Sequence, residues 1–312
     1  MAGLNAQIDR LLKLQRVWHE NKSEVWGIST GFPSFDRLTG GLHKAEVCIL
    51  GARTSHGKTA LANQIAFDIA LRLAVQSADA GETVGQVLMF SPEMSSNMLL
   101  LRQACVLARV PSNKIRTGTA TQVELEAFHE AIALLRLLDP VLTVKAGDQL
   151  SAQEISTQVE TTAATGAPVE LVVIDYLQYL TAGLSGGAGN AYSAASAVSK
   201  EVRVMANRME VPVLLMAQLS RAAAKRAQSD DPDDQLPQLE DLRDSGKIEE
   251  HADTIALMHR PNVLADDQTK PQKAIIVVRK NRNGEVGNFN LFYYPFITRF
   301  EDPLNNLHEV HI

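Results

Sequence analysis

The feature that most constrains this chain is a short loop between an apolar run and a helix-like segment. The loop reads Ala-Arg-Thr-Ser-His-Gly-Lys-Thr over residues 52–59, after the apolar residues 47–50 and before the helix-like residues 60–75. This order is typical of a phosphate-binding loop, in which a glycine permits a sharp turn and successive backbone N–H groups face one point. Ala52 stands where the usual pattern has a glycine, and a small residue still lets the turn form. The chain therefore predicts an α/β nucleotide-binding fold.

The residues of this loop predict how a nucleoside triphosphate is held. Lys58 can reach the β- and γ-phosphates, and the Thr59 hydroxyl can ligate Mg²⁺ at the positive end of a helix. The alternative is a chance Gly-Lys-Thr helix start, which the strand before the loop and the helix after it argue against. The expected nucleotide-binding residues are Ser55, His56, Gly57, Lys58, Thr59 and Ala60.

Composition limits the class of protein. The 312 residues, 45% hydrophobic and 21% charged, suit one large soluble domain. Two cysteines, Cys48 and Cys105, are too few for a disulfide framework and indicate a reducing compartment. Because we find neither a signal peptide nor an apolar run of membrane length, we expect a cytoplasmic protein without a membrane partner. The net charge of −6 argues against coating DNA with the whole surface, but a basic groove remains compatible with it.

Hydrophobic patterning indicates one sheet with helices on both faces. Strand-like and helical runs alternate after the phosphate loop, which favours a mostly parallel sheet. The last third predicts consecutive strands instead, the final two joined by a turn-rich loop at 281–285 as an antiparallel hairpin. The predicted strands are 84–90, 169–174, 211–217, 254–258, 273–278 and 286–294, and the predicted helices are 94–110, 124–138 and 194–209.

The chain divides into a short arm and one domain. Residues 4–18 place apolar side chains near helical spacing and predict an amphipathic arm, which packs either on its own domain or on a neighbouring subunit. We assign residues 1–26 to this arm and its linker and residues 27–312 to the main domain. A glycine-rich segment at 182–190 and an acidic segment at 228–237 are predicted to be mobile loops.

Three polar residues at strand ends are candidates for chemistry at a γ-phosphate. Asp175 ends a buried strand pattern, where a metal-organising carboxylate belongs, although it could equally be only a strand terminus. Glu93 follows another strand and could activate water, and the alternative is an acid in the first turn of a helix starting at Ser91. Gln218 ends a third strand and could sense the γ-phosphate, or be a loop residue at the sheet edge.

Lys280 and Arg282 lie in a basic loop at 279–284, which apolar strands flank. A basic hairpin is usually a solvated surface feature. The alternative is an arginine finger that acts on another subunit's γ-phosphate.

These motifs, in this order, resemble the C-terminal ATPase domain of DnaB-type replicative helicases, a RecA-like P-loop NTPase that works as a ring. The resemblance covers about residues 27–301. The opening Gly-Ile-Ser-Thr-Gly-Phe-Pro at 27–33 is shared by the wider RecA-like group. The discriminating motifs are Ser-Pro-Glu-Met-Ser at 91–95, Ile-Asp-Tyr-Leu-Gln at 174–178, Ala-Gln-Leu-Ser-Arg at 217–221, the segment 241–249, Lys-Asn-Arg-Asn-Gly at 280–284 and Thr-Arg-Phe at 298–300.

The resemblance implies an ATP hydrolase and DNA helicase that uses ATP and Mg²⁺. It assigns phosphate binding to Lys58 and Thr59, metal binding to Thr59 and Asp175, and water activation to Glu93. Gln218 would couple the nucleotide to DNA, and Lys280 and Arg282 would complete a neighbour's site. The residues facing single-stranded DNA would be Arg243, Asp244, which stands where the family usually has Glu, and Gly246.

The resemblance also implies partners. It predicts a homo-oligomer, a hexameric ring on single-stranded DNA, with room for a helicase loader. The arm would then be the linker helix that docks on the adjacent subunit. The family's N-terminal helical domain is missing from this chain, which suggests an excised domain or a minimal form and argues against primase binding.

Other classes of function stay open at this stage. A signalling or clock ATPase of the KaiC kind shares the opening motif and phosphate loop, but tends to carry paired glutamates at the position of Glu93-Met94 and lacks the 241–249 segment. A ring scaffold with a degenerate nucleotide site conflicts with the full set of catalytic groups. Strand recombination is disfavoured by a DNA-contact motif of the helicase type.

Overall fold

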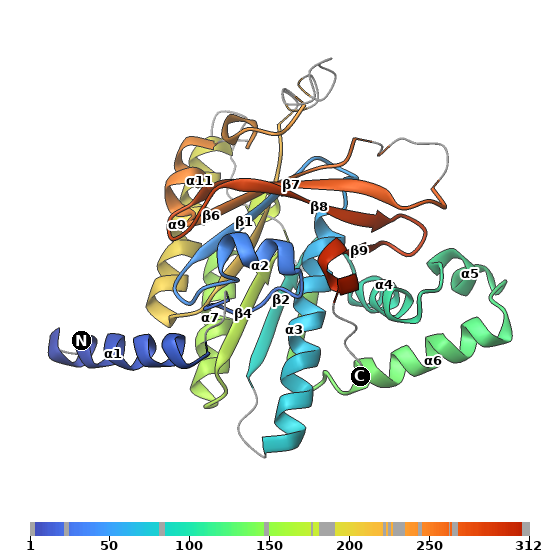
Figure 1. The fold of residues 1–312 in the computed structure, drawn as a ribbon, viewed down its shortest axis with the longest axis horizontal. Helices are drawn as coiled ribbons and strands as arrows, with labels where there is room; N and C mark the ends of the chain where they lie inside the picture. Colours follow the sequence, from blue (N-terminus) through green and yellow to red (C-terminus); the bar gives the residue numbers. More distant parts are fainter. Residues whose placement is uncertain are drawn as a thin grey trace.

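A mixed sheet runs through the centre of the molecule (Figure 1). The structure, a computed structural model, describes residues 4–21, 25–80, 85–146, 150–175, 177–180, 191–220, 223, 226, 235–242, 245–261, 263 and 268–307. Within these residues nine strands join in the order β3-β2-β4-β5-β1-β6-β7-β8-β9. The strands are β1 Val47–Ala52, β2 Gln86–Ser91, β3 Leu142–Ala146, β4 Val169–Ile174, β5 Val213–Gln218, β6 Thr254–His259, β7 Gln272–Asn281, β8 Gly287–Tyr294 and β9 Arg299–Glu301.

Strand direction divides the sheet into two parts. Strands β1 to β6 pair in parallel, so their carboxyl ends meet along one edge. Strands β7, β8 and β9 pair antiparallel with their neighbours. The predicted parallel sheet with an antiparallel C-terminal hairpin is therefore confirmed.

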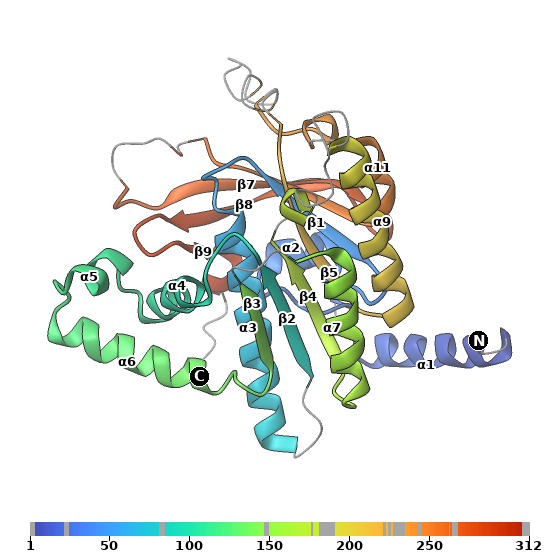
Figure 2. The same cartoon turned by 180° about the vertical axis from the view of Figure 1, so that it is seen from behind.

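Helices cover both faces of the sheet (Figures 1 and 2). The longer helices are α1 Leu4–Asn21, α3 Lys58–Ala80, α4 Ser96–Ala108, α6 Gln122–Arg136, α7 Ala152–Ala164 and α9 Ala191–Met209. The shorter ones are α2 Pro33–Thr39, α5 Ser112–Thr117, α8 Leu177–Leu180, α11 Ser245–His251 and the 3₁₀ turns η1 Leu239–Asp241 and η2 Pro303–Leu307.

Two apolar cores lie on opposite faces of the parallel strands. Leu50 points into a core that α3 completes, whereas its neighbour Ile49 points into a second core with α7 and α9. Because both faces are covered, β1 is buried at every position, as expected for a central parallel strand. Cys48 and Cys105 are buried free thiols, and burial raises the pKa of Cys48 to about 12. They pack as small hydrophobic residues.

Several elements differ from the predicted pattern. Helix α4 starts at Ser96, with Ser95 as its N-cap, so the interpretation of Glu93 as a first-turn residue is wrong. Strand β2 continues to Ser91 and leaves Glu93 in the turn between strand and helix. The pattern missed α2, α5, β3 and α7. The predicted loop 182–190 lies outside the described residues, as does most of 228–237.

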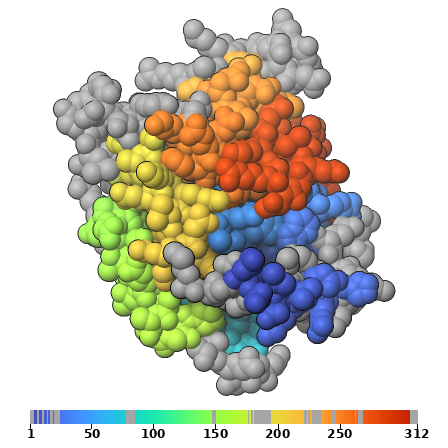
Figure 3. All heavy atoms as spheres, turned by 90° about the vertical axis from the view of Figure 1, so that its left-hand side faces the viewer, coloured from blue at the N-terminus to red at the C-terminus, as the bar shows by residue number. Residues whose placement is uncertain are grey.

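Helix α1 protrudes from one end of the body, beyond α7 and α9 (Figures 1 and 2). Figure 3 faces this end and shows α1 in dark blue in front of the other elements. Leu4, Ile8 and Leu12 are exposed on it. The arm therefore exists as a helix, and its assignment to a separate segment stays a prediction. None of the helices in the described parts of the chain is long and apolar enough to cross a membrane.

Candidate nucleotide site

The phosphate loop leaves the carboxyl end of β1 and opens α3. Ser55 and Gly57 have positive φ angles, 67° and 98°, so the loop curls back on itself before the helix begins. A Cβ atom on Gly57 would lie 2.9 Å from the Phe300 ring. Only glycine combines this backbone conformation with this close approach. The predicted turn at Gly57 is confirmed.

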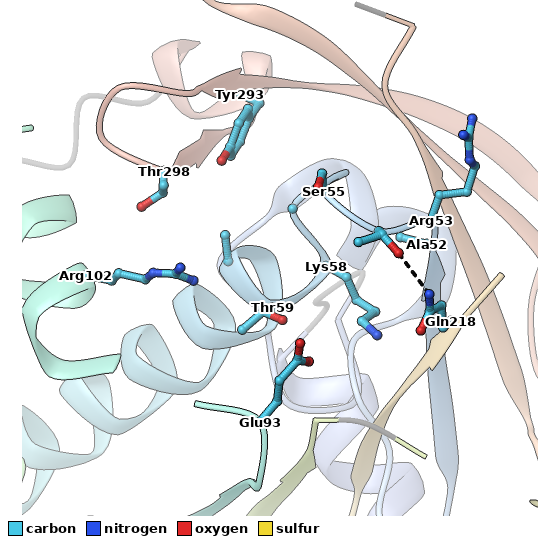
Figure 4. A pocket seen from close by; sticks show the side chains of 13 residues that line it. Ala52, Arg53, Ser55, Lys58, Thr59, Glu93, Arg102, Gln218, Tyr293 and Thr298 are labelled. Atoms are coloured by element: carbon cyan, nitrogen blue, oxygen red, sulfur yellow. Dashed lines mark hydrogen bonds between the residues drawn. The ribbon is translucent and has the colours of Figure 1, made fainter. Parts of the chain in front are cut away.

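A polar pocket of about 270 Å³ opens over this loop (Figure 4). Its floor is the loop itself together with Lys58, Thr59 and Ala60 at the start of α3. The walls come from other elements, namely Glu93 after β2, Arg102 of α4, Gln218 at the end of β5, Tyr293 of β8 and Thr298 of the turn before β9. Residues far apart in the sequence therefore meet at the carboxyl edge of the parallel strands, where α/β folds bind ligands.

Asp175 follows β4 and carries a buried carboxylate. Its backbone N–H donates to the Phe90 carbonyl at 2.8 Å, and the residue has no exposed surface. Burial raises the pKa of the Asp175 carboxyl, while Lys58 and Thr59 act in the opposite direction and Glu93 raises it further. No donor among the described residues meets either carboxylate oxygen with hydrogen-bond geometry. Unsatisfied buried oxygens beside the Thr59 hydroxyl suit a divalent cation.

The cation site is incomplete without a nucleotide. Across the described part of the chain, no group of three or more His, Cys, Asp or Glu residues is placed to hold a metal. Thr59 and Asp175 would supply two oxygens only. The remaining ligands must be phosphate oxygens and water, as is usual for Mg²⁺ bound with a nucleotide.

Lys58 stands at the start of α3, close to two carboxylates. Burial lowers the pKa of Lys58, and the nearby carboxylates of Asp175 and Glu93 partly offset that effect. In Figure 4 its ammonium end points into the pocket between Glu93 and Gln218. A lysine there can neutralise phosphate charge.

Gln218 joins the central strands to the phosphate loop. Its side-chain amide donates to the Thr54 hydroxyl at 2.9 Å. Strand β5 lies between β4 and β1, so the alternative of a residue at the sheet edge is wrong. Gln218 is placed to respond to the contents of the pocket.

The His56 side chain lies behind the loop rather than in the pocket. It is 1% exposed, and its Nδ1 atom accepts from the Arg260 backbone N–H at 3.0 Å. Burial lowers the pKa of His56 to about 3, so the ring is neutral. Arg260 also donates to the Ser55 carbonyl at 3.1 Å and stacks on Tyr293. Nucleotide binding by His56 can involve its backbone alone.

Lys280 and Arg282 lie at the opposite edge of the sheet. Asn281 pairs with Thr254, which pairs with Cys48 near the start of β1. The phosphate loop follows the other end of that strand. Lys280 and Arg282 therefore do not reach the pocket of their own subunit.

Comparison with known proteins gives the family. The model of the DnaB-like helicase C-terminal domain matches residues 27–302. The chain belongs to this family. Replicative DNA helicase DnaB of Pasteurella multocida is 30% identical over 302 residues, which are 96% of this chain and 60% of that protein. DnaB of Geobacillus stearothermophilus is 29% identical over 287 residues, 90% of this chain and 58% of the relative. The chain thus spans about three fifths of the length of these relatives.

Two solved structures share the fold of this DnaB-like domain. The ATPase domain of G40P has a TM-score of 0.79 and 24% identity, and the match covers 94% of this chain and 97% of that one. A DnaB-like replicative helicase, described with its interactions with primase, has a TM-score of 0.77 and 23% identity over 97% of this chain and 67% of that one. The RecA-like fold class is confirmed.

The DNA-contact candidates of this DnaB-like domain are only partly described. Arg243 and Asp244 lie outside the described residues, and Gly246 lies in the first turn of α11. The residue that precedes them lies close to the end of β5. Leu242, which precedes Arg243, forms an isolated β-bridge with Leu219, the residue after Gln218.

Sequence reasoning missed the three pocket residues Arg102, Tyr293 and Thr298, which lie outside the phosphate loop and its strand-end partners. Arg102 was a single cation within the predicted helix 94–110, and Tyr293 an aromatic residue within a predicted strand. Thr298 was noted as part of a closing motif without a function. In Figure 4 Arg102 and Thr298 lie on the side of the loop away from Gln218. A single arginine, Arg102, directly after the apolar run Leu99 to Leu101 was the one available signal.

Proposed function

We propose that this chain is the ATP-driven motor of a replicative DNA helicase that works as a hexameric ring of its copies on single-stranded DNA. One observation carries the proposal: Lys58, Thr59, Glu93 and Gln218 line one pocket, with the Asp175 carboxylate beside Lys58 and Thr59, while the finger candidates lie at the far edge. Such a site is complete only where two copies meet. Family membership supports this proposal over a KaiC-like ATPase.

Within the pocket each residue has a defined chemical task. The loop N–H groups and Lys58 bind and orient the phosphates of ATP. Thr59 and Asp175 would hold Mg²⁺, which when bound draws charge from the phosphate oxygens. The Glu93 carboxylate orients the attacking water and accepts its proton.

The γ-phosphate needs a further cation as charge builds on it. Arg282 is 44% exposed and remote from its own phosphate loop, so the exposed part of its side chain can face the pocket of an adjacent copy. Arginine fingers stabilise transition-state charge and raise turnover by about a thousandfold or more. Hydrolysis would then depend on assembly.

Helix α1 offers a way to hold adjacent copies together. Leu4, Ile8 and Leu12 recur every four residues and are 45–72% exposed, so they form one apolar face. A groove of about 560 Å³ between α4, α6 and β3 is lined by apolar side chains, among them Leu100 and Leu135. We assign α1 of the adjacent copy to this groove, because it is an exposed apolar helix face extending away from its own body.

The β-bridge between Leu219 and Leu242 offers a route by which nucleotide binding is coupled to DNA. Gln218 contacts the phosphate loop, and the next residue, Leu219, pairs with Leu242. The Ser220 N–H also donates to the Asp241 carbonyl at 2.7 Å. A change at the γ-phosphate can therefore move the segment that leads to Arg243, the first DNA-contact candidate.

Steady-state ATP turnover, measured with and without single-stranded DNA, tests the proposal. Lys58→Ala serves as the blank, since it removes the phosphate-binding ammonium without touching residues 241–249. We expect turnover that DNA stimulates and that the blank lacks. Turnover indifferent to DNA at protein concentrations where the chain is oligomeric would contradict the motor assignment.

A further inference from the structure

Asp253, just before β6, is a buried carboxylate shared by two arginines. Its side chain is 4% exposed. Arg282 donates from Nη1 to Asp253 Oδ1 at 3.1 Å, and Arg203 of α9 donates to Oδ2. The Val47 backbone N–H also donates to Oδ2 at 2.9 Å. The carboxylate is therefore fixed to the first residue of the central strand β1.

The backbone around Asp253 holds the same finger region. The Arg282 N–H donates to the Asp253 carbonyl at 3.0 Å, and Arg282 Nη2 donates to the Glu250 carbonyl at 2.9 Å. Lys280 donates from Nζ to the Glu249 carbonyl at 2.6 Å. Both finger candidates are thus attached to the end of α11, and Arg282 is also attached to Asp253, the residue before β6.

These contacts engage both terminal nitrogens of the Arg282 guanidinium, Nη1 and Nη2, and leave part of the side chain in solvent. Its side chain is 44% exposed, whereas the Asp253 side chain that anchors it is almost fully buried. Two guanidinium groups share this one carboxylate. A long, flexible arginine held in one orientation loses less entropy when it meets a phosphate.

We propose that Asp253 is the positioning residue of the trans-acting arginine finger. It orients Arg282 toward the nucleotide of the adjacent copy and does not itself touch that nucleotide. The inference rests on the proposed function, since it requires that Arg282 acts across a subunit interface. It adds a residue whose substitution damages the neighbour's site and leaves the pocket of its own subunit intact.

Mixing of subunits tests this directly. Asp253→Asn keeps the size of the side chain and removes its charge, and we expect turnover of the pure variant to fall by about a hundredfold, as misplaced catalytic groups do. Mixed with Lys58→Ala, the variant supplies intact phosphate loops and receives intact fingers, so turnover should rise well above that of either variant alone. Mixed with Arg282→Ala, it should gain nothing, because both variants have a damaged finger.

Two controls separate positioning from loss of structure. Arg203→Gln removes the other guanidinium from the same carboxylate, and its turnover should stay close to that of the unsubstituted chain. A fluorescent ATP analogue should bind Asp253→Asn with unchanged affinity.

The outcomes distinguish the two claims. Two mixtures are compared, each containing Lys58→Ala. If the mixture with Arg282→Ala regains turnover but the mixture with Asp253→Asn does not, Asp253 is not the positioning residue. An equal loss of turnover in Arg203→Gln would also overturn the inference, because Asp253 would then support the fold of this region and not the orientation of Arg282. If the Arg282→Ala and Lys58→Ala mixture stays inactive, the trans-acting finger itself is wrong.

Discussion

Asp175, next to the pocket residues Lys58 and Thr59, combines full burial with an ionisable group, and this lowers the stability of the fold. Its carboxylate is fully buried, and its pKa is raised above the ordinary value of 3.8, chiefly by desolvation. A carboxyl with a raised folded-state pKa binds its proton more tightly in the native state than in the unfolded chain. Ionisation of Asp175 therefore lowers the free energy of unfolding. This loss of stability develops as pH rises from 3.8, the ordinary pKa, through the raised pKa of the folded protein. A bound cation would offset it.

We therefore predict that Asp175→Asn stabilises the protein and abolishes turnover. Asparagine mimics the uncharged form, so the variant should melt at a higher temperature at pH 7 without nucleotide or Mg²⁺. The difference should shrink as pH falls toward 3.8, where the carboxyl of the unfolded chain also becomes protonated. Thermal melts of both proteins in a chelator across this pH range measure the effect. A lower melting temperature for the variant at pH 7 would show that the carboxylate has a structural partner instead.

Glu93 is predicted to act in chemistry and not in binding. Glu93→Gln keeps the shape of the side chain and removes the base, so turnover should fall by about 10²- to 10⁴-fold. Affinity for an ATP analogue should stay unchanged, because Lys58 and the loop N–H groups remain. For Glu93→Gln, ATP turnover is compared with the equilibrium affinity for a fluorescent ATP analogue. If turnover and affinity both fall, Glu93 acts in nucleotide binding.

The site residues that sequence predicted share one physical origin. Asp175 and Glu93 follow parallel strands and Gln218 ends one, and the carboxyl ends of such strands meet at one edge whatever the connecting helices do. Arg102 and Thr298 reach the pocket from α4 and from the turn before β9. Their positions depend on how those elements pack, which local sequence does not determine.

At the scale of elements, burial explains which strands and helices were found. Central strands such as β4, which is apolar apart from Glu170, were predicted with correct bounds. Strand β3 lies at the sheet edge, is only half-buried and contains Lys145, so its pattern is weak. Helix α7 is rich in threonine, but its capping box of Ser151 and Glu154 was a readable start signal that patterning overlooked.

Helix α1 carries the element-scale prediction. Ile8→Glu combined with Leu12→Glu should dissociate the oligomer without unfolding the subunit, since both side chains are exposed in the single chain. Burying each such side chain contributes about 1.5–3 kcal/mol, so association should weaken by about a hundredfold or more. Lys13→Glu, on the other side of the helix by its spacing, is the matched control. Light scattering after size-exclusion chromatography gives the mass of each variant. If the double variant has the same mass as the unsubstituted oligomer, α1 does not dock on the adjacent copy.

At the scale of the whole molecule, the sheet separates two half-sites. Its carboxyl edge carries the phosphate loop, and the start of β1 lies beside Asp253 and Arg282. A copy with its halves so arranged can donate a finger on one side and receive one on the other. Such head-to-tail contacts close into rings when the rotation between copies permits. The separation of pocket and finger follows from topology, and it agrees with the expectation, from the motif at 280–284, that the finger completes a neighbour's site.

Strand displacement from a forked DNA duplex tests the motor most directly. The assembled chain should release the displaced strand when ATP and Mg²⁺ are present. It should release none with a non-hydrolysable ATP analogue, and Lys58→Ala should release none under any condition. If the chain hydrolyses ATP on the fork and binds the single-stranded arm, yet the duplex stays intact, the helicase assignment is contradicted.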